Sequence, residues 1–441
     1  MLGHADMSVV RRARAAQRVS LRVKVGRTSL PGGGGSPVLP PPGAAPWRGT
    51  ASTVDVPGEA AMAHIVLDAR GYFTTTGRYI RKLVEGLSRL EDDHRYTLVL
   101  PADRLEDWSP PSERFRAVGS SAPFFSLAEQ VGLARQIRAL RPDLVHFCMP
   151  QQPVVLGIPR VTTFHDMTLL KIRNAKKSRV VSWSRRAVGR VAFTAAAHVG
   201  RANIVVSRFS AEDLRRFTGV PRRSIVLTYE AADAIAHAAE TVPVPFERFV
   251  LFVGNQVPYK NLERLFDAVQ DLVPTHPGLG LVVAGRIDDD GRRILQRRPD
   301  IARGAHFTGY VSDGGLRWLY ENAAVFAFPS FFEGFGLPGL EAMRHGCPVA
   351  SSTATCLPEI YGDAAIYFAP EDRVAMASAL RRVIEDPEVA ASLVRRGRRR
   401  VEDFSWERMA DETRAVYERA LRPRDAVTPG PAEAGRPPGN G

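Results

Sequence analysis

Residues 331–343 read Phe-Phe-Glu-Gly-Phe-Gly-Leu-Pro-Gly-Leu-Glu-Ala-Met and join an apolar run at 325–328 to a helical pattern at 337–345. Glycines such as Gly334 and Gly336 suit a loop whose backbone must approach a ligand closely. Pro338 falls in the first helical turn, where proline is well tolerated. Because the first amides of a helix are unpaired and carry about half a positive charge, this junction predicts an anion site that fits a diphosphate.

Strand-like and helical patterns alternate on both sides of this junction, and such alternation predicts parallel sheets covered by helices. In the first half, the strand-like runs are 64–68, 96–100, 144–147, 160–164 and 203–206, and residues 78–90 have helical spacing. In the second half, the strand-like runs are 249–253, 279–284, 305–308, 325–328 and 348–351, with helical patterns at 262–273, 316–321 and 337–345.

Composition shifts divide the chain into five parts. We expect a disordered basic, Gly/Pro-rich leader at 1–61, two Rossmann-like α/β domains at 62–240 and 241–405, a helix at 406–422 that packs back toward the first domain, and a disordered tail at 423–441. The proline-rich break at 241–246 is the predicted linker. Ligands of such sheets bind beyond the carboxyl ends of the strands, so the cleft between the domains is the expected site.

The formal net charge of +13 is local rather than general. Residues 1–61 carry a net +5 and residues 171–190 a net +8, which together account for the whole excess. A nucleic-acid-binding protein on a Rossmann scaffold is therefore disfavoured, and no nucleic-acid partner is expected. Three scattered cysteines, Cys148, Cys347 and Cys356, predict a reducing, cytoplasmic setting. No apolar run approaches the roughly 20 residues that a membrane span needs.

Two glutamates flank the start of the predicted helix, Glu333 in the loop and Glu341 eight residues on. Carboxylates accept hydrogen bonds from hydroxyl groups, so Glu333 suits a sugar ring and Glu341 a ribose. The alternative is a helix-capping Glu333 and an exposed helical Glu341.

This glutamate pair and its surroundings resemble the mark of family 4 (group 1) of the retaining glycosyltransferases, and the likeness extends over about residues 64–420. The resemblance implies the GT-B fold, in which two Rossmann-like parallel-sheet domains face each other across a cleft. It implies transfer of a hexose from a nucleotide-diphosphate sugar, with GDP-mannose favoured by the style of the loops. It also implies no cofactor and no required metal, so the acid run Asp288–Asp290 is interpreted as solvated rather than metal-binding.

Further segments of the second half resemble the family's donor domain. The loop after 249–253 contains Gly254, Asn255 and Lys260, and the resemblance places the lysine on the donor phosphates. Many members have an arginine near Gly254 where this chain has Asn255. Tyr310 and Val311 resemble the segment that lies against the nucleotide base, a plain strand-to-helix turn being the alternative. Gly334, Phe335, Gly336, Leu337 and Glu341 complete the predicted donor site.

Two segments of the first half also fit the family. Gly77 lies where relatives have a glycine-containing loop over the donor phosphates, commonly Gly-Ile-Gly-Arg-Tyr, and this chain keeps just that one glycine. His165 ends the run 160–164 and resembles a strand-end histidine near the transferred sugar; a local hydrogen-bonded pair of His165 with Asp166 is the alternative. Glu333, His165 and Lys260 are therefore the predicted catalytic residues.

The basic segment Lys171–Arg190 mixes cationic with apolar side chains, which suits an anionic bilayer surface, a solvated basic helix being the alternative. We expect a glycan or lipid-linked acceptor used in cell-envelope or polysaccharide synthesis, and a cytoplasmic protein docked on the inner face of the plasma membrane. A sugar-nucleotide epimerase of the same fold, or a non-catalytic sugar-nucleotide-binding protein, is the competing function.

Overall fold

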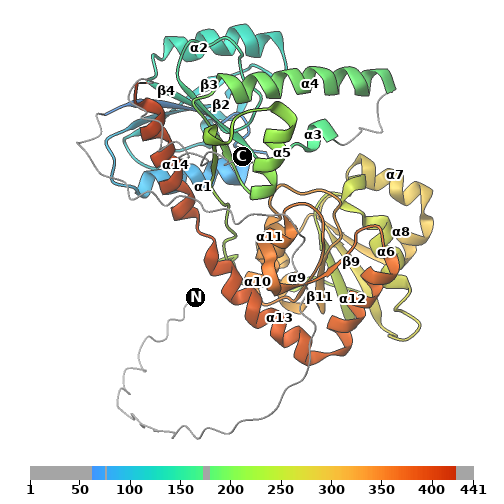
Figure 1. The fold of residues 1–441 in the computed structure, drawn as a ribbon. Helices are drawn as coiled ribbons and strands as arrows, with labels where there is room; N and C mark the ends of the chain where they lie inside the picture. Colours follow the sequence, from blue (N-terminus) through green and yellow to red (C-terminus); the bar gives the residue numbers. More distant parts are fainter. Residues whose placement is uncertain (1–61, 75–76, 172–178, 424–441) are drawn as a thin grey trace, which may run out of the picture. The chain divides into compact units, whose positions relative to one another are not determined.

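The computed structural model describes residues 62–74, 77–171 and 179–423, which contain two parallel sheets (Figure 1). The predicted leader, most of the predicted tail and the middle of the basic segment lie outside these ranges. No helix of the described residues is long and apolar enough to cross a membrane.

The first sheet has seven parallel strands in the order β3-β2-β1-β4-β5-β6-β7. Helices cover both faces of its inner strands, and every residue of β1, β4, β5 and β6 is buried, polar ones such as His146 and Thr162 included. The strands are β1 His64–Asp68, β2 Arg95–Pro101, β3 Phe115–Ser120, β4 Leu144–Phe147, β5 Arg160–Phe164, β6 Ala202–Val205 and β7 Ile225–Leu227. The helices are α1 Gly77–Arg89, α2 Ala134–Ala139, α3 Thr168–Lys171, α4 Arg179–Val199 and α5 Arg208–Thr218.

The second sheet has six parallel strands in the order β10-β9-β8-β11-β12-β13. The strands are β8 Arg248–Val253, β9 Leu279–Ala284, β10 Ala305–Gly309, β11 Val325–Phe328, β12 Val349–Ser352 and β13 Ala365–Phe368. The helices are α6 Leu262–Gln270, α7 Asp289–Arg297, α8 Pro299–Gly304, α9 Asp313–Asn322, α10 Leu337–Arg344, α11 Leu357–Tyr361, α12 Arg373–Glu385 and α13 Pro387–Arg400.

Strand order reverses beside β1 and β4 in the first sheet and beside β8 and β11 in the second. At such a reversal the loops leave the carboxyl ends of neighbouring strands in opposite directions, which opens a crevice for a ligand. The loops after β1, β4, β8 and β11 are therefore where a functional site is expected.

The last helix, α14 (Trp406–Leu421, red in Figure 1), packs on α1, β4 and β5 of the first sheet. Its buried side chains recur at helical spacing, and the hydroxyl of Tyr417 lies 2.6 Å from Nδ1 of the buried His146 on β4. The backbones of α1 and α14 approach closely, because a Cβ atom at Gly86 would lie 2.4 Å from the Cβ of Ala410. The end of the chain thus stabilises the first sheet.

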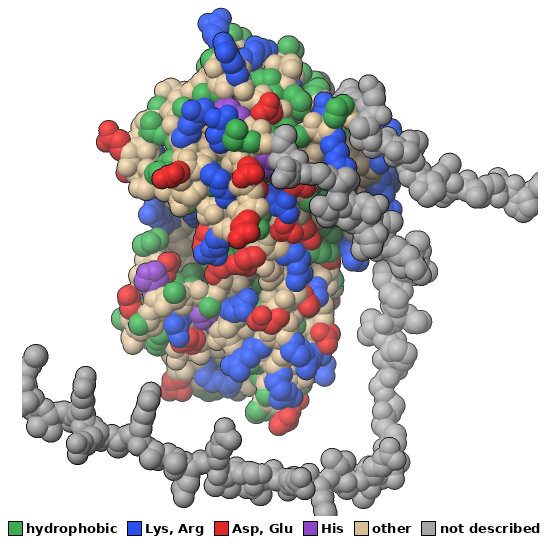
Figure 2. All heavy atoms as spheres, turned by 90° about the vertical axis from the view of Figure 1, so that its left-hand side faces the viewer, with side chains coloured by type: hydrophobic (Ala, Val, Ile, Leu, Met, Phe, Trp, Pro, Cys, Tyr) green, Lys and Arg blue, Asp and Glu red, His purple; other side chains and the backbone are tan. Residues whose placement is uncertain are grey.

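Charges of both signs are interspersed over the face that Figure 2 shows, without a large area of one sign. This distribution agrees with a sequence whose basic excess is confined to two segments.

Candidate active site

The loop between β11 and α10 is shaped by glycine. Gly336 has a φ of 99°, and a Cβ atom there would lie 2.6 Å from the hydroxyl oxygen of Tyr361, which donates a 2.6 Å hydrogen bond to the Gly336 carbonyl. Any larger residue would be strained and would displace Tyr361. Phe335 is buried and Leu337 half-buried, which anchors the loop on both sides of the turn. The amide end of α10 therefore starts at a defined place.

Lys260 and Glu333 meet although 73 residues separate them. The Nζ of Lys260 donates to Oε1 of Glu333 over 2.7 Å, and each side chain is 13% exposed. The lysine ends a short turn after β8, and its Nζ lies 5.2 Å from the centre of the Phe328 ring. Asn261 fixes this turn by donating to the carbonyls of Pro329 and Pro370. The pair places opposite charges at one edge of the second sheet.

Glu341 is buried in the middle of α10, so the alternative of an exposed helical Glu341 does not apply. Its carboxylate accepts hydrogen bonds from Arg78 on α1 and, over 3.0 Å, from the hydroxyl of Tyr320. Burial and the charge of Glu341 raise the pKa of Tyr320 well above its usual value. Burial alone would lower the pKa of Arg78, but Glu341 raises it overall. Arg78 and Tyr320 were not singled out by the sequence.

Gly77 begins α1, and its position admits no side chain. A Cβ atom there would lie 1.9 Å from the carbonyl oxygen of Tyr72, and its amide donates to the carbonyl of Thr74 over 3.0 Å. Glycine is therefore required by close packing of the turn, and a contact of Gly77 with donor phosphates stays a prediction.

His165 follows β5 and bonds two groups that are distant in sequence. Its Nδ1 lies 3.0 Å from Oε1 of Glu230, and its Nε2 lies 3.2 Å from the carbonyl oxygen of Cys148. The Asp166 carboxylate instead accepts from the amide of Thr168 over 2.7 Å, so His165 and Asp166 do not form the local pair considered as an alternative. Burial lowers the pKa of His165, but the hydrogen bond and charge of Glu230 outweigh this and raise it.

The loop after β5 touches the loop after β11. A Cβ atom at Gly334 would lie 2.4 Å from the carbonyl oxygen of His165. Ser207, the N-cap of α5, donates to the Gly334 carbonyl over 2.8 Å, and Ser210 donates to the His165 carbonyl over 3.0 Å. The loop that carries His165 and the loop that carries Glu333 thus meet through their backbones and two serines.

The segment 357–365 adds a second connection of the same kind. The Glu359 carboxylate accepts from the amides of Arg208 and Phe209 at the start of α5, over 2.8 and 3.1 Å. A carboxylate at a helix N-terminus is favourable for the helix dipole. This contact supports a structural role for the segment, in which α11 holds α5 against the site.

Gly254 lies at the end of β8 with a φ of 139°, and Gly285 comes so near that a Cβ atom there would lie 2.6 Å from the Gly254 carbonyl oxygen. Asn255 is exposed. The neighbouring Gln256, which has no sequence signature, is fully buried and donates to the Gly254 carbonyl over 2.9 Å. It also accepts from the amide of Asp288 and so ties this loop to α7.

Tyr310 follows β10 and is 72% exposed, while Val311 is half-buried. The guanidinium of Arg286, which follows β9, lies 5.2 Å from the centre of the Tyr310 ring. Because β8, β9 and β10 are neighbouring parallel strands, Gly254, Arg286 and Tyr310 lie at the same edge of the sheet. An exposed aromatic ring at this edge is available to a planar ligand.

Asp288 caps α7 by accepting from the amide of Gly291 over 2.8 Å, and Asp289 and Asp290 form ion pairs with Arg292 and Arg293 one turn on. Throughout the described ranges, no three His, Cys, Asp or Glu side chains are grouped so that they could hold a metal ion.

Solved structures with this architecture define the fold. The chain superposes on sucrose-phosphate synthase from Thermosynechococcus elongatus with a TM-score of 0.66 and 21% identity, over 81% of this chain and 98% of that one. It superposes on Anabaena HepE, solved in complex with UDP and glucose, with a TM-score of 0.61 and 18% identity, over 81% and 99%. The two parallel sheets form the GT-B fold of glycosyltransferases, which confirms the predicted fold class.

Sequence comparisons give the family. Residues 76–234 match the model described as Glycosyltransferase Family 4, and residues 233–400 match Glycosyl transferases group 1. The O-antigen chain mannosyltransferase B of Escherichia coli is 32% identical over 269 residues, which are 58% of this chain and 69% of that protein. The MMP alpha-(1->4)-mannosyltransferase of Mycolicibacterium hassiacum is 34% identical over 179 residues, 40% and 43% of the two chains. The chain belongs to family 4 (group 1) of the glycosyltransferases.

Proposed function

We propose that this glycosyltransferase is a retaining hexosyltransferase that moves a hexose from a nucleotide-diphosphate sugar to a glycan or lipid-linked acceptor in cell-envelope or polysaccharide synthesis. The observation that carries the proposal is the Lys260–Glu333 pair beside the amide end of α10, in a loop that touches the His165 backbone. GDP-mannose is the favoured donor, which the two mannosyltransferase relatives support; the UDP and glucose bound by HepE make UDP-glucose the donor to compare.

In this proposal the donor diphosphate lies at the start of α10, between residues Gly334 and Leu337, and against Lys260. A helix N-terminus and a compact ammonium group together offset the leaving negative charge, so no metal and no other cofactor is assigned. Glu341 takes the ribose hydroxyls, and the base lies near Tyr310 and Val311. One preorganised donor of this kind contributes about 3 kcal/mol to transition-state stabilisation.

We infer same-face attack as the route to retention. The bond from the anomeric carbon to the diphosphate oxygen breaks while the bond to the acceptor oxygen forms on the same face. The acceptor proton passes to the leaving phosphate oxygen, which balances the charge. Glu333 orients the sugar through its hydroxyl groups, because a carboxylate accepts several such hydrogen bonds.

A thermal-shift panel of nucleotide sugars tests the donor. A true donor at 100 times its dissociation constant stabilises the folded chain by about 2.7 kcal/mol, so one of GDP-mannose and UDP-glucose should raise Tm clearly above the other. A panel without any stabilising nucleotide sugar would contradict the proposal. Tight donor binding without transfer would favour the epimerase or the non-catalytic protein, and NMR of an inverted anomer in the product would reject retention.

An exposed apolar surface on the first sheet's loops supports a lipid-linked acceptor. Its members are exposed and lie on two segments that Gln130 joins by hydrogen bonds to Gln152 and Val154. They are Phe125 (47% exposed), Leu127 (84%), Val131 (57%), Val154 (40%) and Val155 (75%). Exposed arginines at 135, 138 and 141 accompany them, and Glu129, the one acid of residues 121–142, is buried.

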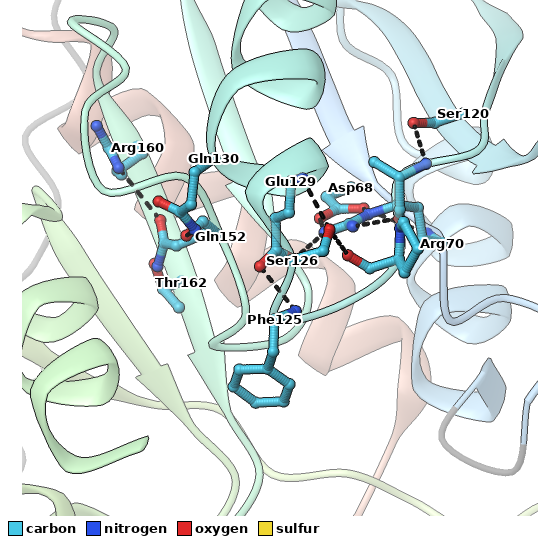
Figure 3. Close-up of polar contacts among 12 residues, drawn as sticks. Asp68, Arg70, Ser120, Phe125, Ser126, Glu129, Gln130, Gln152, Arg160 and Thr162 are labelled. Atoms are coloured by element: carbon cyan, nitrogen blue, oxygen red, sulfur yellow. Dashed lines mark hydrogen bonds and ion pairs between the residues drawn. The ribbon is translucent and has the colours of Figure 1, made fainter. Parts of the chain in front are cut away.

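A buried ion cluster holds this surface in place (Figure 3). Arg70 donates to Asp68 over 2.7 Å and to Glu129 over 2.9 Å, and Glu129 also accepts from the amide of Phe125 over 3.0 Å. Figure 3 shows the Phe125 ring directed away from the cluster. An apolar surface with cationic neighbours is suited to an anionic bilayer.

Membrane docking through Lys171–Arg190 remains part of the proposal, with a cytoplasmic protein bound to the inner face of the plasma membrane. Of this segment, Lys171 pairs with Asp213 and lies 4.9 Å from the Phe332 ring, and Arg190 lies 5.1 Å from the Phe217 ring. Equal, negligible binding to neutral and anionic liposomes would remove the idea.

The apolar surface has its own test. The double variant Leu127→Ser, Val155→Ser should lose liposome binding. The control Val374→Ser, which changes a valine that is 72% exposed on α12, should keep it.

A further inference from the structure

Both ring nitrogens of His165 face pure hydrogen-bond acceptors. One partner is the carboxylate of Glu230, 3.0 Å from Nδ1, and the other is the carbonyl oxygen of Cys148, 3.2 Å from Nε2. A neutral imidazole has one N–H and one lone pair, so either tautomer would point its lone pair at an oxygen lone pair. Only the imidazolium form donates to both partners.

The groups around the His165 ring favour a positive charge on it. The side chains of His165 and Glu230 are 20% and 7% exposed, so water screens their attraction little. The Tyr79 ring packs edge-on against the His165 ring, with 4.7 Å between the ring centres, and the Tyr79 hydroxyl is hydrogen-bonded to the Thr163 hydroxyl rather than to His165. The remaining titratable neighbours are Asp166, Cys148 and His146, of which Asp166 adds a further favourable charge.

His146 is the second histidine of this buried region, and it stays neutral. Burial and the charge of His165 lower the pKa of His146 to about 3. Its two nitrogens bond the hydroxyls of Tyr417 and Thr163, which can each donate or accept and therefore tolerate a neutral ring. The contacts of the two rings thus favour a cation at His165, which faces two acceptors, and a neutral ring at His146, which faces two hydroxyls.

We propose that Glu230 holds His165 as an imidazolium at neutral pH, which places a positive charge beside the donor loop and takes no proton from the acceptor. The proposal rests on the proposed hexosyl transfer for its mechanistic meaning. Glu230 is then a positioning residue that acts through His165, and the His165 charge adds to those of Lys260 and the α10 amides. An imidazolium cannot serve as a general base, which leaves that task to the departing phosphate oxygen.

The charge on His165 makes transfer activity depend on pH. Since the pKa of His165 is raised in the folded chain, the charged pair is complete below that pKa and is lost as the pH rises through it. Transfer activity should therefore fall on the alkaline side. In Glu230→Gln the carboxylate is gone, so the decline should begin at lower pH, with about a tenfold loss of kcat/KM for each further pH unit.

NMR titration of the full chain with isotopically labelled histidine tests the pairing without any need for turnover. The His165 signal is assigned by its absence in His165→Gln. We expect both ring nitrogens to be protonated at neutral pH in the natural chain, the pKa to drop in Glu230→Gln, and Glu230→Asp to restore part of the shift. Asp166→Asn is the matched control, because it removes an adjacent carboxylate that bonds the Thr168 amide rather than the ring, and it should shift the pKa less.

A single neutral tautomer of His165 at neutral pH would overturn the proposal, as would an unchanged His165 pKa in folded Glu230→Gln. Should Glu230→Gln fail to fold by circular dichroism, the protonation state in the natural chain and in Glu230→Asp still decides. Failure of the proposed hexosyl transfer would appear separately, as a doubly protonated His165 in a chain that transfers no sugar.

Discussion

Replacing Gly334 by alanine adds one methyl group where the loops after β5 and β11 touch. The new Cβ would lie 2.4 Å from the His165 carbonyl oxygen, about 1 Å inside an ordinary contact of 3.4 Å. The obstacle is backbone, which cannot rotate away like the end of a flexible side chain, so one of the two loops must move. A displacement of about 1 Å in a reacting geometry costs about 100-fold in rate.

We therefore expect Gly334→Ala to lower kcat/KM about 100-fold, with a loss of unfolding free energy of about 1–3 kcal/mol from the overpacked contact. Initial rates with the donor found in the thermal-shift panel measure the first quantity, and urea unfolding the second. Gly132→Ala is the matched control, because a Cβ atom at Gly132 would meet nothing within 4 Å. Full activity of a folded Gly334→Ala would refute the reasoning that these loops form the reacting site.

Three further substitutions test the packing of α14 on α1, the buried ion cluster around Arg70, and the neutral His146. Gly86→Ala forces α1 away from Ala410 on α14 and should cost about 1–3 kcal/mol of unfolding free energy by urea titration while kcat stays near its natural value. Arg70→Met leaves the carboxylates of Asp68 and Glu129, which are 5% and 2% exposed, without their cation. The free energy of unfolding should therefore fall by about 3–5 kcal/mol, measured by urea titration, and a loss of less than about 1 kcal/mol would count against a buried cluster. His146, whose pKa is lowered to about 3, binds its proton more weakly in the folded than in the unfolded chain. Stability should thus be fully present above about pH 6.5 and fall toward pH 3 by up to about 1.4 kcal/mol per pH unit, and urea midpoints of His146→Gln should follow a flatter course.

Much of the fold could be predicted from short apolar runs. The strands β1, β4, β5, β9 and β11 begin and end at the predicted residues, because a strand buried on both faces is rich in apolar and β-branched residues. The strands β3, β7 and β13 were missed; they lie at the sheet edges, where half-exposed and polar residues break the pattern, as Arg116 does in β3. Strand order was beyond the sequence, since it depends on pairing between distant segments.

In the candidate site, too, residues in local motifs could be predicted, and residues paired over long sequence distances were missed. Glu333, Lys260 and Gly334 lie in local motifs whose residue types already indicate a donor site, and the structure brings them together. Glu230 was missed because its partner His165 is 65 residues away, and Arg78 because its partner Glu341 is 263 residues away. Arg78 follows Gly77 as the arginine does in Gly-Ile-Gly-Arg-Tyr, so that motif was the signal that could have found it, whereas no local pattern marks Glu230.

The central claim is that an acidic side chain and a lysine, together with the amides of α10, hold an activated sugar. Initial-rate kinetics of Glu333→Ala and Lys260→Ala, in samples shown by circular dichroism to be folded, test it most directly. We expect kcat/KM to fall about 100- to 1,000-fold in each, with Glu91→Ala, an exposed control before β2, unchanged. Undiminished turnover in either site variant would contradict the claim.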